Sequence, residues 1–310
     1  MIALFRGKIF SACVCLALLA SLGCGRKEQA AAAGGETADD GRHALTGTVI
    51  SLSPERGTAL VDHEEIPGYM ARMTMEFHVN PGDLKVLREG LRIRAKMYEA
   101  GDGYYLEEIW PVDPAAERVV QAAGQALRQD TVTRGSSPYR EVGEFLPHFA
   151  LYDQNGAVVQ ITQLRGRQIV LNFIFTRCPD AKMCPATVMK MMQLQAMARE
   201  AGVTDLELIS ITLDPEYDTP GVLRDYADAR GIDTSNYTFL TGPERAIKDM
   251  LAQLGVLAFQ NGPLLQHTLA TVLIDARGKI IHRVDGSEWK PDDFAARLKR
   301  PEPPAPNANG

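Results

Sequence analysis

The stretch Val170-Leu-Asn-Phe-Ile-Phe-Thr-Arg-Cys-Pro-Asp-Ala-Lys-Met-Cys-Pro-Ala186 decides the fold of the larger part of this chain. Its apolar first half predicts a buried strand, and the two cysteines Cys178 and Cys184 follow, each directly before a proline. The chain has five cysteines, and the other three lie in the first 24 residues. Two cysteines at the end of a buried strand indicate either a redox couple or a soft-metal site.

The spacing of the two cysteines predicts how the chain continues. On one continuous helix, residues six apart would lie ~120° apart in azimuth and ~9 Å apart along the axis, so Cys178 and Cys184 could not meet. Proline is favoured at the first helical position, so we expect the helix to begin at Pro185 with Cys184 as its cap. Residues 179–183 then fold Cys178 back over the helix N-terminus, where the positive helix end favours thiolates. Such a pair either binds a metal or forms the disulfide Cys178–Cys184.

The sequence around this stretch alternates strands and helices. An Asn-Gly turn within residues 149–162 predicts a hairpin. Further strands are expected over residues 206–214 and in a hairpin from His267 to residue 284, and helices over residues 186–201, 220–230 and 243–254. This alternation predicts an α/β thioredoxin-like domain over residues 142–300. A helical linker over residues 114–141, with its helix running from Pro114 to about Arg128, precedes it.

An all-β domain is predicted before the linker, over residues 43–113. Five short strands separated by Pro, Gly and Asp indicate a small OB-like five-stranded barrel, with strands over residues 45–53, 57–65, 73–80, 91–100 and 103–112. Met73 and Met75 lie two apart in a strand, so their side chains share a face. Two thioethers with the imidazole of His63 would suit Cu(I). The alternative is that these methionines only fill the core.

The two ends of the chain are predicted to lie outside both domains. Arg6 and Lys8 precede an apolar run, which predicts a signal peptide over residues 1–24. The ending of that run resembles a bacterial lipoprotein box with Cys24 as the lipidated residue, followed by a disordered polar tether over residues 25–42. The alternatives are an ordinary cleaved signal and an uncleaved anchor, and all three export the chain. Residues 301–310 are predicted to be disordered.

The overall charge argues against nucleic acid as a partner. The chain carries 33 basic and 39 acidic residues, a formal net charge of −6, and no long basic run. Nucleic-acid binding usually requires a concentrated basic patch or stripe.

The barrel segment resembles a known family. His63, the IPG tripeptide that follows it and the Met73-Thr-Met75 motif are similar to the CusF-like periplasmic copper-binding proteins. Those proteins hold Cu(I) in a five-stranded barrel with one histidine and two methionines, which implies His63, Met73 and Met75 as ligands here. The family's capping tryptophan corresponds to Met70. Met70 is therefore either a further thioether ligand or a replacement that leaves the site more open.

The second domain resembles the Sco/SenC family of copper chaperones. The motifs FTRCP…CP, DPEYDTP and LLQHT occur in the family's order. The resemblance implies Cys178, Cys184 and His267 as copper ligands, with Asp214 and Asp218 in a loop beside the site. Family members serve the assembly of the dinuclear copper centre of cytochrome c oxidase, and some act as reductants of its cysteines. The family spaces its cysteines by three residues, whereas five intervene here, which puts the metal geometry in question but not the fold.

These observations predict an exported, lipid-anchored metallochaperone on the periplasmic side of a bacterial membrane. It would bind Cu(I), with Cu(II) as an alternative in the second domain, and the resemblance to the Sco/SenC family implies the cytochrome c oxidase subunit that holds the dinuclear centre as its partner. Ligand exchange needs no turnover chemistry, so no enzymatic activity is required. One alternative is a thiol–disulfide oxidoreductase that cycles Cys178 and Cys184 with a thioredoxin-like reductant and has no need of His267. Another is a periplasmic copper buffer without a specific client.

Overall fold

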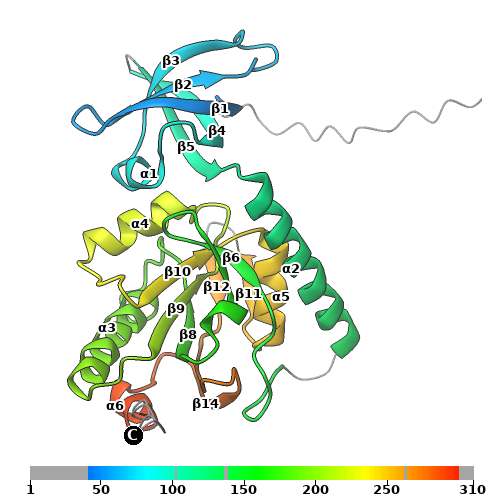
Figure 1. Ribbon diagram of the computed structural model, residues 1–310, viewed down its shortest axis with the longest axis vertical. Helices are drawn as coiled ribbons and strands as arrows, with labels where there is room; N and C mark the ends of the chain where they lie inside the picture. Colours follow the sequence, from blue (N-terminus) through cyan, green and yellow to red (C-terminus); the bar gives the residue numbers. More distant parts are fainter. Residues whose placement is uncertain (1–40, 102, 136–138, 262–263, 300–310) are drawn as a thin grey trace, which may run out of the picture. The chain divides into compact units, whose positions relative to one another are not determined.

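The computed structural model describes residues 41–101, 103–135, 139–261 and 264–299 (Figure 1). The predicted signal peptide, the lipidation at Cys24, nearly all of the tether and the C-terminal tail lie outside these residues. Within them, no helix is both long and apolar enough to cross a membrane.

The first part of the described chain is a closed five-stranded barrel, as predicted. Its strands follow the order β1-β2-β3-β5-β4 around the barrel, and a short helix, α1, which the sequence did not predict, follows β3. The bounds are β1 Arg42–Ser53, β2 Thr58–His63, β3 Met73–His78, α1 Pro81–Val86, β4 Arg92–Ala100 and β5 Gly103–Pro111. Inward-facing residues alternate along the strands and fill the interior, among them Leu45, Val49, Val61, Phe77, Ile93 and Met97.

Gly47 allows β1 and β2 to approach closely at the end of the barrel that carries His63. Gly47 lies directly opposite His63 in the β1–β2 register. A Cβ atom at this position would lie 2.7 Å from Val61 Cγ1 and 2.9 Å from the Asp62 carbonyl oxygen. A larger residue would therefore push the two strands apart.

A long helix, α2 (Pro114–Arg134), follows the barrel and continues six residues beyond the predicted end. The Asp113 side chain caps it by accepting from the Ala115 amide at 2.8 Å. Leu127 is buried in the core of the α/β part, and Arg128 forms an ion pair with Asp249 at 3.1 Å. This helix is therefore docked along the α/β part.

The remainder is the predicted thioredoxin-like α/β domain, built on a seven-stranded sheet. The strand order is β14-β13-β8-β9-β10-β6-β7, in which β8, β9 and β10 are parallel and the other pairs antiparallel. The bounds are β6 Ala150–Asp153, β7 Val158–Gln160, β8 Gln168–Ile174, β9 Leu206–Thr212, β10 Tyr237–Thr241, β13 Ala270–Ile274 and β14 Ile280–Asp285. The sequence did not predict β10.

The helices of this domain bury apolar residues in one core with the central strands. Their bounds are η1 Ile161–Leu164, α3 Cys184–Glu200, α4 Pro220–Ala229, α5 Glu244–Gln253 and α6 Pro291–Ala295. A separate two-stranded hairpin, β11 (Ala258–Asn261) with β12 (Leu264–His267), was also not predicted. The three parallel strands point the loops after β8 and β9 to the same edge of the sheet, and that edge carries the cysteines.

Candidate metal sites

The central strand β8 delivers the two cysteines. All of its residues are buried, and the chain turns after Phe175 into the loop that carries Cys178. Cys178 is half-buried, whereas Cys184 is fully buried at the first position of α3. The predicted start at Pro185 is one residue too late, because Met183 is the N-cap and makes no side-chain capping bond. The predicted fold-back of Cys178 over this helix end is confirmed by the proximity of the two sulfurs described below.

His267 reaches the cysteines from the hairpin. It is the last residue of β12, not the first residue of a strand as predicted, because the next strand begins only at Ala270. Its Nδ1 lies 3.1 Å from the Thr268 carbonyl oxygen and its Nε2 lies 4.0 Å from Cys184 Sγ. Donation from Nδ1–H to this carbonyl leaves the Nε2 lone pair facing the sulfur. The Phe175 ring and the imidazole pack edge to face, with their ring centroids 5.4 Å apart.

The ligand atoms of Cys178, Cys184 and His267 all lie within 4.8 Å of one another, and this is the one such cluster of Cys, His, Asp or Glu among the described residues. Two sulfurs and an imidazole nitrogen form a donor set suited to copper and other soft or borderline metals. Both cysteines are free thiols here. The two sulfur atoms lie within 4.8 Å of each other, and a disulfide bond would bring them to ~2 Å, which requires a small movement of the loop. The Cys178–Cys184 disulfide stays a prediction.

Burial sets the protonation of this cluster in the absence of metal. Burial raises the pKa of the Cys184 thiol well above its usual value, although the helix N-terminus had been expected to favour the thiolate. Burial also lowers the pKa of His267, which keeps the imidazole neutral and able to act as a ligand. Metal binding must therefore displace a proton from Cys184.

The acidic loop after β9 is tied to the segment before Cys178. Asp218 is fully buried and accepts from the Thr176 amide at 3.1 Å and from the hydroxyls of Thr176 and Thr212. Burial raises the pKa of Asp218 to about 6, against the opposing effect of these hydrogen bonds. The sequence placed Asp218 beside the site but gave no signal that the two threonines would surround it.

Asp214 forms an ion pair with Arg177, the residue next to Cys178. The Arg177 guanidinium donates to Asp214 at 2.6 Å and lies over the Tyr217 ring at 4.0 Å. The loop after β9 is therefore bound to the cysteine loop by hydrogen bonds at both Thr176 and Arg177. Sequence reasoning missed Arg177 because an arginine beside a cysteine has no distinctive spacing.

An open cavity of about 650 Å³ gives access to the cluster. Cys178 and His267 line it, whereas Cys184 does not. Met183 also lines it, so a thioether faces the same space as Cys178. The wall is completed by Phe175, Arg177, Pro179, Asp180, Asp214, Leu265 and Gln266.

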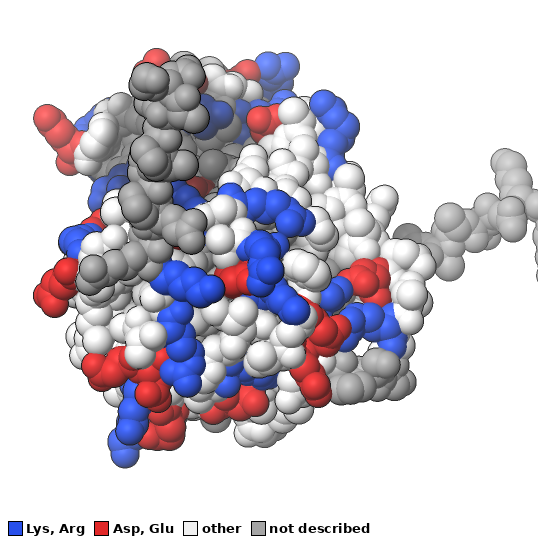
Figure 2. Space-filling view, turned by 60° about the horizontal axis from the view of Figure 1, so that its bottom comes forward, with Lys and Arg blue, Asp and Glu red and all other residues white. Residues whose placement is uncertain are grey.

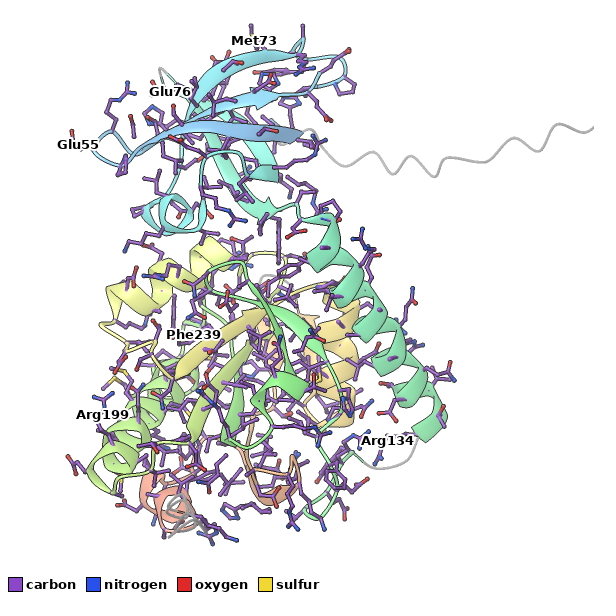
Figure 3. The ribbon with its side chains drawn as sticks, in the orientation of Figure 1. Glu55, Met73, Glu76, Arg134, Arg199 and Phe239 are labelled. Carbon is purple, nitrogen blue, oxygen red and sulfur yellow. The ribbon has the colours of Figure 1, made fainter. Side chains whose placement is uncertain are left out.

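The barrel brings its predicted ligands onto one face. His63 lies directly opposite Met73 in the β2–β3 register, and Met75 lies two residues further along, opposite Val61. Directly opposite side chains in such a pair lie about 5 Å apart at Cβ, and diagonal ones are still within reach. His63 is fully buried, whereas Met73, at the start of β3, is 48% exposed (Figure 3), so this face extends from the interior of the barrel to its surface.

One nitrogen of His63 has no partner in the barrel. Its Nδ1 lies 2.7 Å from the Glu64 carbonyl oxygen, while the buried Nε2 has no hydrogen-bond partner among the described residues. A buried polar atom without a partner is costly, and coordination of a metal would satisfy it. The residues present therefore fit a metal bound by one imidazole and two thioethers.

Met70 lies in the tight turn before β3. Its backbone pairs with Ile66 on both sides, with N–O distances of 2.8 Å and 3.0 Å. Its side chain is half-buried and packs against the barrel core. The ring of the neighbouring Tyr69 stacks on the His43 ring, with the two ring centroids 3.9 Å apart, so an aromatic pair lies beside this turn.

Comparisons with known proteins agree with both parts of the fold. Residues 137–301 match the family model described as SCO1/SenC, and residues 42–111 match that of the copper binding periplasmic protein CusF. An SCO2-like protein of Rickettsia typhi is 36% identical over 140 residues, covering 43% of this chain and 66% of that protein. One of Rickettsia felis is 34% identical over 140 residues, covering 43% and 65%. The chain therefore spans slightly less than two thirds of the length of these relatives.

Solved structures that are similar to about half of this chain are also known. The crystal structure of a SCO1/SenC family lipoprotein from Bacillus anthracis is 28% identical, with a TM-score of 0.45. The match covers 51% of this chain and 95% of that one.

Proposed function

The chain belongs to the SCO1/SenC family, and on this premise we propose that it is a copper metallochaperone that serves the dinuclear copper centre of cytochrome c oxidase. The observation that carries the proposal is the convergence of Cys178, Cys184 and His267 within 4.8 Å. These donors match a soft metal, and the cavity beside them leaves the site open to an acceptor. Copper is the cargo, so the protein has to bind it and then release it.

The unequal burial of the two cysteines supports an order of ligand exchange. Cys184 is fully buried and Cys178 is half-buried and lines the cavity with His267. An incoming thiolate of the acceptor would displace Cys178 or His267 first, and Cys184 would leave last. Asp214 and Asp218 would hold the cysteine loop during this exchange through Arg177 and Thr176. Copper would be Cu(I), with Cu(II) as the alternative at this site.

The barrel would supply a second copper site made of His63, Met73 and Met75. Thioethers are weaker ligands than thiolates, which supports transfer from the barrel to the cysteine site. Two sites on one chain raise the effective concentration for that transfer. Met70 lies in the turn before β3 and not on the strand that carries Met73 and Met75, which supports a role beside the site more than a role as a full ligand.

The proposed location is the periplasmic side of a bacterial membrane, with Cys24 as the lipid anchor. The match of residues 42–111 to a periplasmic copper-binding family supports export. The partner would be the oxidase subunit that holds the dinuclear copper centre.

Metal analysis of the reduced protein tests this function. We expect about two Cu(I) per chain in the wild type and about one in Cys178→Ser/Cys184→Ser. Met73→Leu/Met75→Leu is the matched variant for the other domain and should also retain about one. Full stoichiometry in the cysteine variant would contradict the proposed site.

A thiol–disulfide oxidoreductase is the second candidate, supported by the closeness of the two sulfurs. In that reaction the thiols of Cys178 and Cys184 would reduce a client disulfide to two thiols and become a disulfide themselves. A thioredoxin-like reductant would restore them. His267→Ala separates the candidates, because it should abolish copper binding at this site but spare disulfide reduction. Failure of copper transfer to any purified oxidase subunit, with binding intact, would favour a copper buffer.

A further inference from the structure

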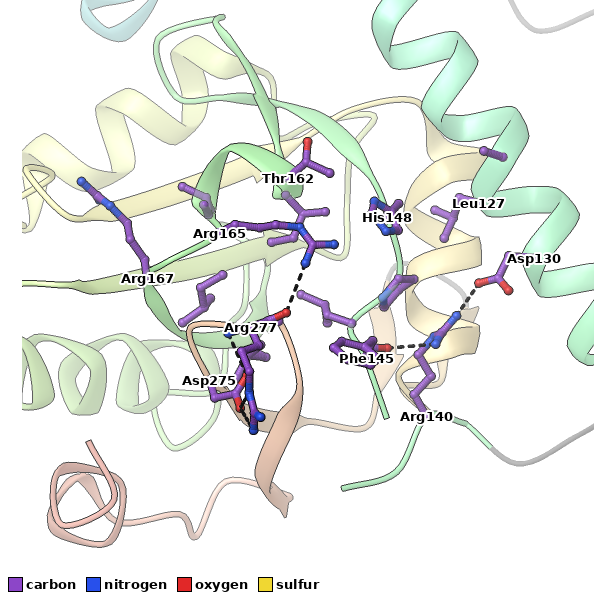
Figure 4. A pocket seen from close by; sticks show the side chains of 18 residues that line it. Leu127, Asp130, Arg140, Phe145, His148, Thr162, Arg165, Arg167, Asp275 and Arg277 are labelled. Carbon is purple, nitrogen blue, oxygen red and sulfur yellow. Dashed lines mark hydrogen bonds and ion pairs between the residues drawn. The ribbon is translucent and has the colours of Figure 1, made fainter. Parts of the chain in front are cut away.

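A second cavity lies at the opposite end of the sheet from the cysteines. It has a volume of about 580 Å³ and shares no lining residue with the cavity of the copper site. Its walls come from α2, the segment of residues 140–148, η1 and the residues after it, the start of β8, and the end of β13 with the turn that follows (Figure 4). Figure 2 turns this end of the molecule toward the viewer and shows lysine and arginine side chains near the middle of the face.

Nine of the eighteen residues that line this cavity are apolar, and eight are polar or charged. Buried or half-buried side chains form most of the wall, and the exposed Phe145 ring stands beside them. The apolar members are Ala126, Leu127, Phe145, Leu146, Pro147, Ile161, Leu164, Ile169 and Ile274. A cavity of a few hundred Å³ that combines apolar walls with polar groups at its edge can hold a small molecule that has both an apolar and a polar part.

Three of the four arginines that line the cavity are already neutralised. Arg140 pairs with Asp130, Arg167 with Glu207 and Arg277 with Asp275. Each of these positive charges is therefore balanced within the protein.

Arg165 is different, because among the described residues it has no carboxylate partner. Its only hydrogen bond within this part of the chain runs from Nη1 to the Arg277 carbonyl oxygen, at 3.3 Å. Figure 4 shows its side chain extending toward that carbonyl. The guanidinium keeps four further donors and an unbalanced charge at the edge of an apolar space.

We propose that this cavity binds a small amphiphile with a single anionic head group, a carboxylate or a phosphate monoester. The head group would pair with Arg165 in the bidentate manner that guanidinium favours, and the apolar tail would lie between α2 and η1. The site is independent of the copper cluster, so ligand binding here does not require copper.

Titration calorimetry on the reduced, copper-free chain tests the proposal with four probes: dodecanoate, dodecyl phosphate, dodecanol and acetate. We expect saturable one-to-one binding of the first two and about tenfold weaker binding of dodecanol, because a hydrogen bond to a charged group is lost. Acetate, which lacks the tail, should not bind measurably. The relative affinities of dodecanoate and dodecyl phosphate identify the preferred head group.

Three variants make the test specific. Arg165→Gln retains a donor for the Arg277 carbonyl and should weaken dodecanoate about tenfold while leaving dodecanol unchanged. Arg118→Gln removes the same charge from an exposed position of α2 outside the cavity and should change nothing. Thr162→Trp, at an exposed lining position, should weaken both probes by filling the space. The proposal is overturned if dodecanoate does not saturate, if Arg165→Gln and Thr162→Trp bind it normally, or if Arg118→Gln is as damaging as Arg165→Gln.

Discussion

Replacement of Asp218 by asparagine should remove most of one pH-dependent contribution to the stability of the α/β domain. The carboxylate is fully buried, and its pKa rises from 3.8 to about 6 on folding because burial disfavours the charge. A raised folded pKa means that the native state holds the proton more tightly than the unfolded chain. The contribution of Asp218 to the unfolding free energy is therefore fully present below pH 3.8 and is lost as the pH rises through about 6.

The magnitude follows from the size of the shift. A rise of about two units corresponds to about 3 kcal/mol of unfolding free energy between about pH 4 and pH 7. The asparagine side chain does not titrate, keeps the shape of the aspartate, and can accept from the Thr176 amide while donating to a threonine hydroxyl. The difference in unfolding free energy, wild type minus Asp218→Asn, should therefore fall by about 3 kcal/mol over that range.

Urea denaturation of reduced, copper-free protein at several pH values from about 4 to 7 measures this difference. The chain has two tryptophans, and a Trp110→Phe background leaves the buried Trp289 of the α/β domain as the reporter. Asp292→Asn, at an exposed position of α6, controls for the loss of a negative charge. Stability curves of wild type and Asp218→Asn that run parallel with pH would refute the reasoning, because Asp218 would then titrate alike in both states.

Three further predictions concern the metal ligands and their supports. Thiol counting on metal-free protein purified without reductant should find few free thiols at Cys178 and Cys184, and two after reduction; two alkylated cysteines under oxidising conditions would exclude the disulfide. Cu(I) affinity of the barrel should fall markedly in Met73→Leu or Met75→Leu and less in Met70→Leu, measured by competition with a Cu(I) chelator; equal losses would make Met70 a full ligand. Gly47→Ala should destabilise the barrel by about 1–3 kcal/mol in thermal unfolding, because the new methyl group would overlap Val61 and the Asp62 carbonyl; an unchanged Tm would mean that β1 and β2 separate freely.

The regular elements were predictable where a periodic pattern and a turn signal coincided. In β1, fully buried and half-buried positions alternate, and the prolines and glycines between the barrel strands mark the turns of the barrel. β10 was missed because it is short and lacks that alternation. The hairpin of β11 and β12 was missed because each strand has only four residues, too few to show a periodic pattern.

The candidate sites were predictable as residue types but not as an arrangement. Motif order placed Cys178, Cys184 and His267 together, yet His267 arrives from a hairpin strand that the sequence did not indicate. The contacts of Asp218 with Thr176 and Thr212 depend on the parallel pairing of β8 with β9, which brings their ends to one edge. The cavity around Arg165 is lined by segments that lie far apart in the sequence, so no local sequence pattern predicts it.

The attachment of His267 to a two-stranded hairpin has a mechanical consequence. Two of the proposed ligands lie at the start of α3 and in the loop before it, while the third lies 83 residues further on from Cys184, in a hairpin that is not part of the main sheet. A metal held by all three would act as a cross-link that staples the hairpin to the core. We expect the amide hydrogens of the hairpin to exchange with solvent more slowly when copper is bound. An acceptor protein that binds this hairpin would thereby distinguish the copper-bound protein from the copper-free protein, because the hairpin is less mobile in the copper-bound form.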